Sequence, residues 1–251
     1  MQSPSSSDVA RVGLQLYTIR AECDRDLEGA LRRVGALGYE GVELFQLHGH
    51  EPEQVRRWLD DAGLVAIGRH AGLEALESGL PELARELATL GTDRIALSWI
   101  RPSRRAARRV EQVARSVGGA GLSFGFHNHG AELKPVSRFG RATFLDLLRE
   151  LPPELLWLEL DLGWVWHAGA DPVAELERTT GRCPLVHLKD YASREGPDVP
   201  VGDGVVGYER VVLAAVRAGA EWLVVEQDTV EGPPFAAAER SLHAVRRLLA
   251  V

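Results

Sequence analysis

Residues 155–190 read LLWLELDLGWVWHAGADPVAELERTTGRCPLVHLKD, and this stretch has the pattern of one β-α-β unit. The apolar runs at 155–160 and 184–188 predict two buried strands. The segment 171–180 between them has the apolar spacing of an amphipathic helix. Two strands joined through a helix run parallel, so this stretch predicts neighbouring strands of a parallel sheet.

The same alternation of strand and helix continues along the whole chain. Strands are expected at 12–16, 41–44, 64–68, 94–98, 122–126, 155–160, 184–188 and 222–226. Helices are expected at about 26–37, 52–62, 79–90, 103–118, 140–150, 171–180, 207–219 and 235–249. Eight such repeats predict an α/β protein, a single (β/α)8 TIM barrel, with an open doubly wound sheet as the alternative. A disordered tail is expected at 1–10 and the barrel at 11–251.

Composition narrows the class of protein. The 251 residues carry a formal net charge of −7, which disfavours a nucleic-acid partner because such binding relies on Lys and Arg. No segment has the apolar length of a membrane helix, and the first residues lack the apolar stretch of a signal peptide. Cys23 and Cys183 imply no disulfide framework, so we expect a cytoplasmic protein.

Polar residues recur where the predicted strands of the second half of the chain end. They are His127-Asn128-His129, Glu159 with Asp161, His187 with Lys189, and Glu226 with Asp228. A parallel barrel places all of its strand ends in one ring, so these side chains converge. Residues two apart on a strand share a face, so one member of each pair lies deeper than the other. Converging His, Asp and Glu side chains are what a divalent metal site requires.

Short motifs, in order along the chain, give it a family resemblance. They are GLQLY (13–17), GYEGVE (38–43), HNHGAE (127–132), Asp161 with AGADP (168–172), HLKD (187–190), PVGDG (200–204) and EQD (226–228). Their order and spacing resemble the sugar phosphate isomerase/epimerase superfamily of xylose-isomerase-like TIM barrels. The resemblance spans nearly the whole chain and implies a metal-dependent enzyme that acts on a small sugar, keto-sugar or cyclitol.

The resemblance also implies one divalent metal, bound by side chains from strands five to eight. Asp161, His187 and Glu226 match three of the ligand positions. At the first position many members have Glu, and this chain has a His-Asn-His sequence instead. Glu132 is the expected replacement, with His129 or His127 as alternatives. Mn²⁺ is the expected metal, and Zn²⁺, Fe²⁺, Co²⁺ or Mg²⁺ are the alternatives.

Such a site suits removal of a proton next to a carbonyl group. A metal that holds a ketone oxygen and a neighbouring hydroxyl acidifies the carbon between them, and the product is a metal-stabilised enediolate. The resemblance makes Glu226 the expected base, with Glu43 and His70 as further candidates. Lys189 is expected to neutralise the developing charge. Contacts with the substrate are expected from His127, His129, Trp164 and Tyr17, with Trp99 and Trp166 as further parts of an apolar wall.

The leading hypothesis is an isomerase or epimerase of an unphosphorylated substrate. The first alternative is a lyase on the same site, either an inosose-type dehydratase or a 3-keto-glycoside eliminase, because it shares the proton removal. The second is a barrel that binds a sugar without catalysis. Endonuclease IV, a DNA-acting relative, has His where this chain has Trp164, which disfavours DNA repair. The resemblance also leaves a homo-oligomer open.

Overall fold

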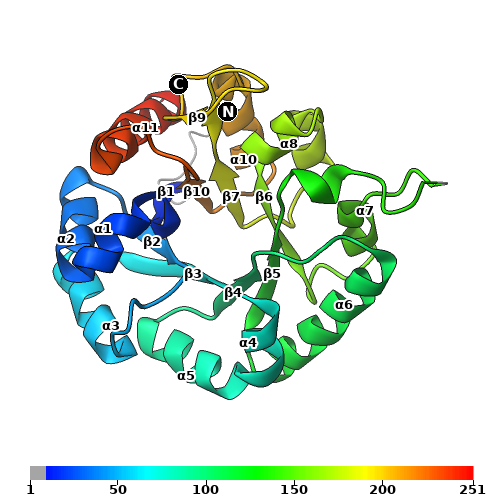
Figure 1. The fold of residues 1–251 in the computed structure, drawn as a ribbon, viewed down its shortest axis with the longest axis horizontal. Coiled ribbons are helices and arrows are strands. Elements are labelled where there is room, and N and C mark those ends of the chain that lie inside the picture. Colours follow the sequence, from blue (N-terminus) through cyan, green and yellow to red (C-terminus); the bar gives the residue numbers. More distant parts are fainter. Residues whose placement is uncertain (1–9, 139, 251) are drawn as a thin grey trace, which may run out of the picture.

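Eight parallel strands close into a barrel, and helices surround it (Figure 1). The computed structural model describes residues 10–138 and 140–250. The barrel strands are β1 (Arg11–Gln15), β2 (Gly41–Leu44), β3 (Val65–Ala71), β4 (Arg94–Leu97), β5 (Ser123–His127), β6 (Trp157–Asp161), β7 (Leu185–Leu188) and β10 (Trp222–Val225). The expectation of a (β/α)8 TIM barrel is therefore confirmed.

Closure of the barrel rests on the pairing of its first strand with its last. Leu14 of β1 lies beside Val42 of β2 on one side and beside Val225 of β10 on the other, both in parallel register. The remaining strands pair with their neighbours in chain order. Because all of the strands run the same way, their carboxyl ends lie on one face of the barrel.

The helices begin and end near the signals that the sequence carries. Pro52 opens α3, where its missing N–H breaks no helical hydrogen bond. Gly38, with a φ of 99°, ends α2 in the left-handed conformation that glycine adopts most easily. The helices are α1 (Arg20–Arg25), α2 (Leu27–Leu37), α3 (Pro52–Asp61), α4 (Leu73–Ser78), α5 (Leu80–Leu90), α6 (Arg104–Gly119), α7 (Phe144–Arg149), α8 (Leu162–His167), α9 (Pro172–Glu177), α10 (Tyr208–Arg217) and α11 (Pro234–Leu249).

Two tryptophans fill the barrel interior near the amino ends of the strands. Trp157 opens β6 and Trp222 opens β10, and both belong to a buried apolar cluster with Ile67. Glycines leave the space that these rings occupy. A Cβ on Gly125 would lie 2.4 Å from the Trp157 ring, and a Cβ on Gly41 would lie 2.9 Å from Trp222. The interior is therefore a packed core, as in other barrels of this size.

Several connections hold short elements that hydrophobic periodicity does not predict. Three are the six-residue helices α1, α4 and α8, and another is the antiparallel hairpin of β8 (Asp190–Tyr191) and β9 (Asp198–Val199). The helix expected at 140–150 begins only at Phe144, because the side chain of Thr143 caps it. The helix expected at 171–180 ends at Glu177.

The structure bears on three further expectations, which concern the first residues, the cysteines and membrane-spanning helices. The tail expected at 1–10 lies outside the described residues, except for Ala10, which is buried. Cys23 and Cys183 are buried as free thiols. Along 10–138 and 140–250, no helix combines the length and the apolar character needed to span a membrane.

Candidate active site

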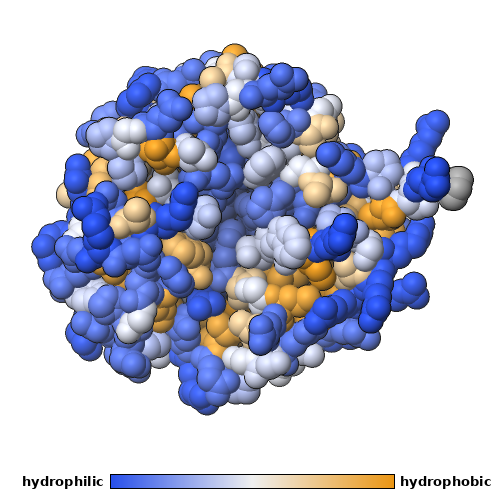
Figure 2. Space-filling view, viewed as in Figure 1, coloured by the Kyte–Doolittle hydropathy of each residue, from blue (hydrophilic) through white to orange (hydrophobic). Residues whose placement is uncertain are grey.

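The carboxyl ends of the strands gather a set of buried polar side chains. Each is at most 8% exposed: Glu43, His70, His127, Glu159, Asp161, His187, Lys189 and Glu226. Figure 2 shows a hydrophilic hollow over the middle of the barrel on the face that carries these strand ends. Burial of so many ionisable groups is costly unless each is paired or binds a metal.

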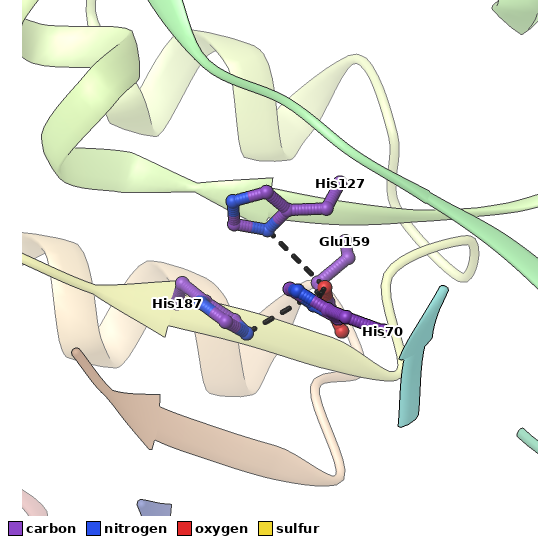
Figure 3. A group of neighbouring side chains, drawn as sticks. All are labelled: His70, His127, Glu159 and His187. Carbon is purple, nitrogen blue, oxygen red and sulfur yellow. Dashed lines mark hydrogen bonds and ion pairs between the residues drawn. The ribbon is translucent and has the colours of Figure 1, made fainter. Parts of the chain in front are cut away.

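Three imidazole rings converge on the carboxylate of Glu159. Together these residues form what we call the inner cluster: His70, His127, Glu159 and His187 (Figure 3). Glu159 Oε2 lies 2.6 Å from His70 Nε2 and 3.2 Å from His127 Nδ1. The same oxygen lies 3.6 Å from His187 Nε2. Three imidazoles and one carboxylate are a donor set that Zn²⁺ accepts.

Glu43 lies beside the inner cluster and holds two of its rings. Its Oε2 accepts a hydrogen bond from Gln15 Nε2 at 2.8 Å. The same oxygen lies 2.7 Å from His187 Nε2 and 3.3 Å from His70 Nε2. Burial penalises the Glu43 carboxylate, but the charges of His70 and His187 outweigh it and hold the pKa of Glu43 well below its usual value. Burial likewise opposes protonation of His70, yet Glu43 and Glu159 raise the pKa of His70 to about 10.

A second group, the outer cluster, shares two rings with the first and consists of His127, Asp161, His187 and Glu226. His187 joins the clusters, because its Nδ1 lies 2.9 Å from Glu226 Oε2 while its Nε2 faces Glu43. Burial and the nearby charge of His187 hold the pKa of His127 well below its usual value. The direction of this shift favours the neutral form of His127.

Lys189 is fully buried beside the outer cluster. Its Nζ lies 2.7 Å from Asp228 Oδ2, 3.2 Å from Asp161 Oδ2 and 3.3 Å from Glu226 Oε2. Burial opposes its charge, but the carboxylates of Asp161 and Glu226 raise the pKa of Lys189 well above its usual value. Burial also opposes ionisation of Glu226, yet Lys189 and His187 lower its pKa below the usual range. The group is therefore a network of formed charges.

Asp161 uses one oxygen for the fold and leaves the other for the site. Its Oδ1 accepts the N–H of Trp164 at 2.8 Å and so caps α8. Its Oδ2 accepts no hydrogen bond from the described residues, although Lys189 Nζ lies 3.2 Å away. Burial raises the pKa of Asp161 to about 6. A buried oxygen without a hydrogen bond, beside imidazole nitrogens and a second carboxylate, fits the ligand set of a divalent metal.

The residue expected as the first metal ligand lies apart from both clusters. Glu132 is buried in the 3-10 helix η2 (Gly130–Leu133), and its Oε2 accepts the N–H of His129 at 3.0 Å. Burial raises the pKa of Glu132. Neither cluster includes Glu132 or His129, whereas His127 belongs to both. The choice among these three ligands stays a prediction, and the geometry favours His127.

A cavity of about 400 Å³ opens over the clusters. The expected site residues that line it are Tyr17, His70, Trp99, His127, His129 and Glu226. Glu43 and Lys189 are not among its lining residues, and both are fully buried. Trp164 does not line it either, and its ring centre lies 5.4 Å from Lys189 Nζ.

Two features of the site escape the sequence reasoning. Phe45 lines the cavity, although nothing in its residue type marks it as part of a site. Its position directly after the strand expected at 41–44 was the available signal, because the loops that follow barrel strands form the site in this fold. The meeting of three histidines on Glu159 is the second feature, and spacing along single strands carries no signal for it.

Comparison with known proteins finds other chains with the same fold. No curated protein matches the chain. A sugar phosphate isomerase/epimerase from Parabacteroides distasonis superposes with a TM-score of 0.78 at 21% identity, covering 100% of this chain and 96% of that one. The IOLI protein with a bound zinc atom gives 0.76 at 12% identity, covering 96% and 98%. A probable 3-DHS dehydratase, AsbF from Bacillus anthracis, gives 0.71 at 15% identity, covering 93% and 98%. Likeness at these identities shows the fold alone.

A match to a family of sequences goes further than these superpositions. The model of xylose isomerase-like TIM barrels matches residues 31–248. That range contains the barrel strands from β2 to β10, and with them all four residues of the outer cluster. The chain therefore belongs to the family of xylose isomerase-like TIM barrels.

Proposed function

We propose that this protein is a divalent-metal-dependent isomerase or epimerase of a small unphosphorylated sugar, keto-sugar or cyclitol. The observation that carries the proposal is the outer cluster, in which two imidazoles and two carboxylates meet beneath a cavity of about 400 Å³. The buried ammonium of Lys189 lies within 3.3 Å of both carboxylates. The ammonium keeps these carboxylates charged, and charged carboxylates beside imidazole nitrogens are suited to holding a divalent metal.

The proposed metal ligands are Asp161, His187 and Glu226, with His127 or Glu132 as the fourth. When bound there, a divalent metal supplies Lewis-acid polarisation of a carbonyl oxygen. Imidazole nitrogens together with carboxylate oxygens favour Mn²⁺, Zn²⁺ or Fe²⁺ over Ca²⁺. Mn²⁺ stays the expected metal, and elemental analysis of the purified protein tests that expectation.

Glu226 and His70 are the side chains that we propose to move protons. Both line the cavity, and they come from strands on different sides of the barrel, β10 and β3. Glu226 is ionised despite its burial, because Lys189 and His187 lower its pKa. Its carboxylate is the group that we propose to accept the proton from the substrate carbon, because it is ionised and lines the cavity. His70 is protonated, because Glu43 and Glu159 raise its pKa against the effect of burial, so it returns a proton. An epimerisation needs two such groups on different sides of the substrate.

Lys189 and Glu43 act through their neighbours in this proposal. Neither is among the cavity-lining residues in the described part of the chain. Lys189 holds the carboxylates of Asp161 and Glu226 in place and in their charged form. Glu43 orients the rings of His70 and His187 in the same way that a carboxylate orients a metal-binding histidine. We therefore assign both residues positioning roles, without contact with the substrate.

A lyase on the same site is the second candidate function. Elimination begins with the same proton removal and ends when a neighbouring oxygen substituent leaves with its bonding electrons and takes up a proton. Asp228 lines the cavity, and its Oδ2 lies 2.7 Å from Lys189 Nζ. A second acidic side chain therefore stands beside Glu226, where it can assist the leaving group.

Incorporation of solvent deuterium tests the proposal. Mn²⁺-loaded protein is incubated in D₂O with ketohexoses, inososes and 3-keto-glucosides, and the products are analysed by NMR and mass spectrometry. Deuterium in a product of unchanged molecular formula supports the isomerase, whereas release of water or of an alcohol assigns the lyase. Sugar binding without exchange into any compound would contradict both and leave a barrel that only binds.

Single variants then separate the roles of the residues. Glu226→Gln should lower the exchange rate by about 100-fold or more, whereas Glu231→Gln, an exposed carboxylate on the same connection, should keep it. Metal content is measured for each variant, so that loss of the base is distinguished from loss of a ligand. The same measurement on His127→Ala and Glu132→Gln identifies the first metal ligand, because only loss of the true ligand lowers the affinity for the metal.

A further inference from the structure

The cavity over the clusters has a second wall of a different character. Tyr17, Phe45 and Trp99 line it, and we call these three residues the aromatic rim. Trp99 is 64% exposed and Tyr17 is 38% exposed, while Phe45 is half-buried. The rings of Tyr17 and Phe45 meet edge to face with their centres 5.4 Å apart. Large aromatic faces thus stand in water at the mouth of a polar cavity.

The two kinds of wall belong to different halves of the barrel (Figure 1). The residues of the aromatic rim follow β1, β2 and β4, whereas the outer cluster comes from β5, β6, β7 and β10. Since β1 to β4 are neighbours in the closed sheet, the rim occupies one continuous arc of the mouth. A ligand whose carbonyl end reaches the outer cluster therefore extends towards aromatic rings on the other side of the cavity.

The charges of the lining residues disfavour a phosphorylated ligand in this cavity. Among the described residues, two carboxylates, those of Glu226 and Asp228, line the cavity together with three histidines. No lysine or arginine of the described chain lines it, so the lining offers a phosphate neither of these partners, although Arg20 stacks on the ring of Tyr17 from outside the lining. Between the aromatic residues the wall consists of Ala71, Gly72 and Ser98, which are small and uncharged. The rim is therefore suited to an uncharged, apolar group.

We propose that the substrate is a keto-glycoside with an apolar aglycone, and that the aromatic rim binds this aglycone while the keto-sugar occupies the polar floor. The proposal rests on the proposed function, because it takes the outer cluster as the end at which the sugar reacts. Flat aromatic side chains bind flat or apolar groups by stacking and by burial of area, and they lose little conformational entropy in doing so. A single exposed aromatic residue is ordinary on a protein surface. Three that line one cavity together with the proposed reactive groups form a contiguous patch, and such patches mark binding sites.

Calorimetric titration of the Mn²⁺-loaded protein tests the proposal with matched ligands. The probes are the methyl and phenyl β-glycosides of D-glucose and D-galactose and the 3-keto form of each. In at least one pair the phenyl compound should bind about tenfold tighter than the methyl compound, which corresponds to one stacked ring. Equal affinity within every pair, or no binding by any phenyl glycoside, overturns the proposal.

Trp99→Ala is the decisive variant, because an exposed side chain can be removed without opening the core. It should reduce the phenyl advantage to less than about threefold and leave the methyl glycoside unchanged, whereas Trp99→Phe should retain most of it. Leu213→Ala is the control, since Leu213 is 37% exposed on α10 and does not line the cavity. A phenyl advantage that survives Trp99→Ala contradicts the proposal. So does a dimer that this variant dissociates, because the rim would then be a subunit interface.

A substitution at Gly72 gives an independent test, because it adds a side chain to the cavity instead of removing one. It lines the cavity, its φ of −75° suits any residue, and a Cβ placed there meets nothing within 4 Å. Gly72→Leu should therefore weaken phenyl glycosides about tenfold and methyl glycosides little. Gly119→Leu, where a Cβ is also free of contacts, should change neither.

The two proposals fail in different ways. If deuterium exchanges into both methyl and phenyl compounds and the two bind with equal affinity, the proposed function holds and the aglycone site is rejected. A phenyl preference that depends on Trp99, without exchange into any compound, keeps the aglycone site and rejects the catalytic proposal.

Discussion

Asp190 organises the segment that follows β7 from a single buried side chain. Its Oδ2 accepts the N–H groups of Gly202 at 2.9 Å and Gly204 at 3.1 Å. Its Oδ1 accepts those of Tyr191 at 2.9 Å and Val206 at 3.1 Å. A Cβ on Gly204 would lie 2.3 Å from Asp190 Oδ1, so glycine is needed there for the backbone to approach. The PVGDG motif is therefore explained by the fold, since these contacts lie within the connection.

Asp190→Asn should destabilise the protein through this segment. An amide accepts with one atom only, so N–H groups that now bond to the other oxygen lose their acceptor. The free energy of unfolding in urea should fall by about 2 kcal/mol, as expected for buried donors left unpaired. Asp203→Asn is the matched control, because Asp203 is exposed and pairs with Arg240 at the surface. Similar losses in both variants would argue against the assigned role.

Lys189→Met should be among the most damaging single substitutions in the metal-free protein. It leaves Asp161, Glu226 and Asp228 close together without their buried cation. Loss of about 3–5 kcal/mol in unfolding free energy is expected when one partner of a buried charge network is removed. The chain's other lysine, Lys134, is exposed, so Lys134→Met should be nearly neutral. A Lys189→Met protein as stable as the parent would show that these carboxylates are protonated.

At the scale of the element, a charged network joins α7 to α9. Asp146 Oδ2 accepts the N–H of Thr143 at 2.9 Å, and its Oδ1 lies 2.5 Å from Arg178 Nη2. Partial burial opposes ionisation of Asp146, but the bonds from Thr143 and Arg178 outweigh it and lower its pKa to about 2. The network therefore connects the start of one helix to the end of another through a carboxylate that stays charged in mild acid.

This network should make stability depend on pH in a defined direction. A depressed folded-state pKa contributes stability above the unfolded value of about 3.9, and that contribution is lost as the pH falls towards 2. Asp146→Asn should therefore be less stable than the parent at pH 6, and the difference should shrink between pH 5 and pH 3. Urea unfolding at several pH values measures it, with the exposed Asp61→Asn as control. A difference that is constant with pH would contradict the assignment.

At the scale of the whole molecule, the proposed metal should stabilise the barrel. Ligands from β5, β6, β7 and β10 tie four strands together at one point. Mn²⁺ at about 100 times its dissociation constant should add about 2.7 kcal/mol to the free energy of unfolding. Thermal unfolding with and without EDTA measures the gain. Asp161→Asn should abolish it and Glu231→Gln should keep it, and a gain that survives Asp161→Asn would place the metal elsewhere.

The barrel could be predicted because its signal is repeated eight times, and each strand carries its own apolar run. The convergence of Asp161, His187 and Glu226 could be predicted for the same reason, since strand ends of a parallel barrel meet. The inner cluster could not, because the approach of His70 to Glu159 depends on the depth and tilt of side chains from strands 89 residues apart. The six-residue helices α1, α4 and α8 were not predicted because each is an additional short helix in a connection, beyond the one helix expected after each strand.

The tryptophan-filled interior limits the routes by which a ligand can enter and leave the cavity. Because Trp157 and Trp222 fill the barrel interior near the amino ends of the strands, the cavity over the clusters does not continue through the barrel in the part of the chain that the structure describes. If the proposed reaction takes place there, substrate and product enter and leave through the same mouth, at the carboxyl ends of the strands. In the lyase alternative, an aglycone released at the aromatic rim would therefore leave before the sugar that lies deeper in the cavity. Inhibition by either fragment should compete directly with arrival of the next reactant.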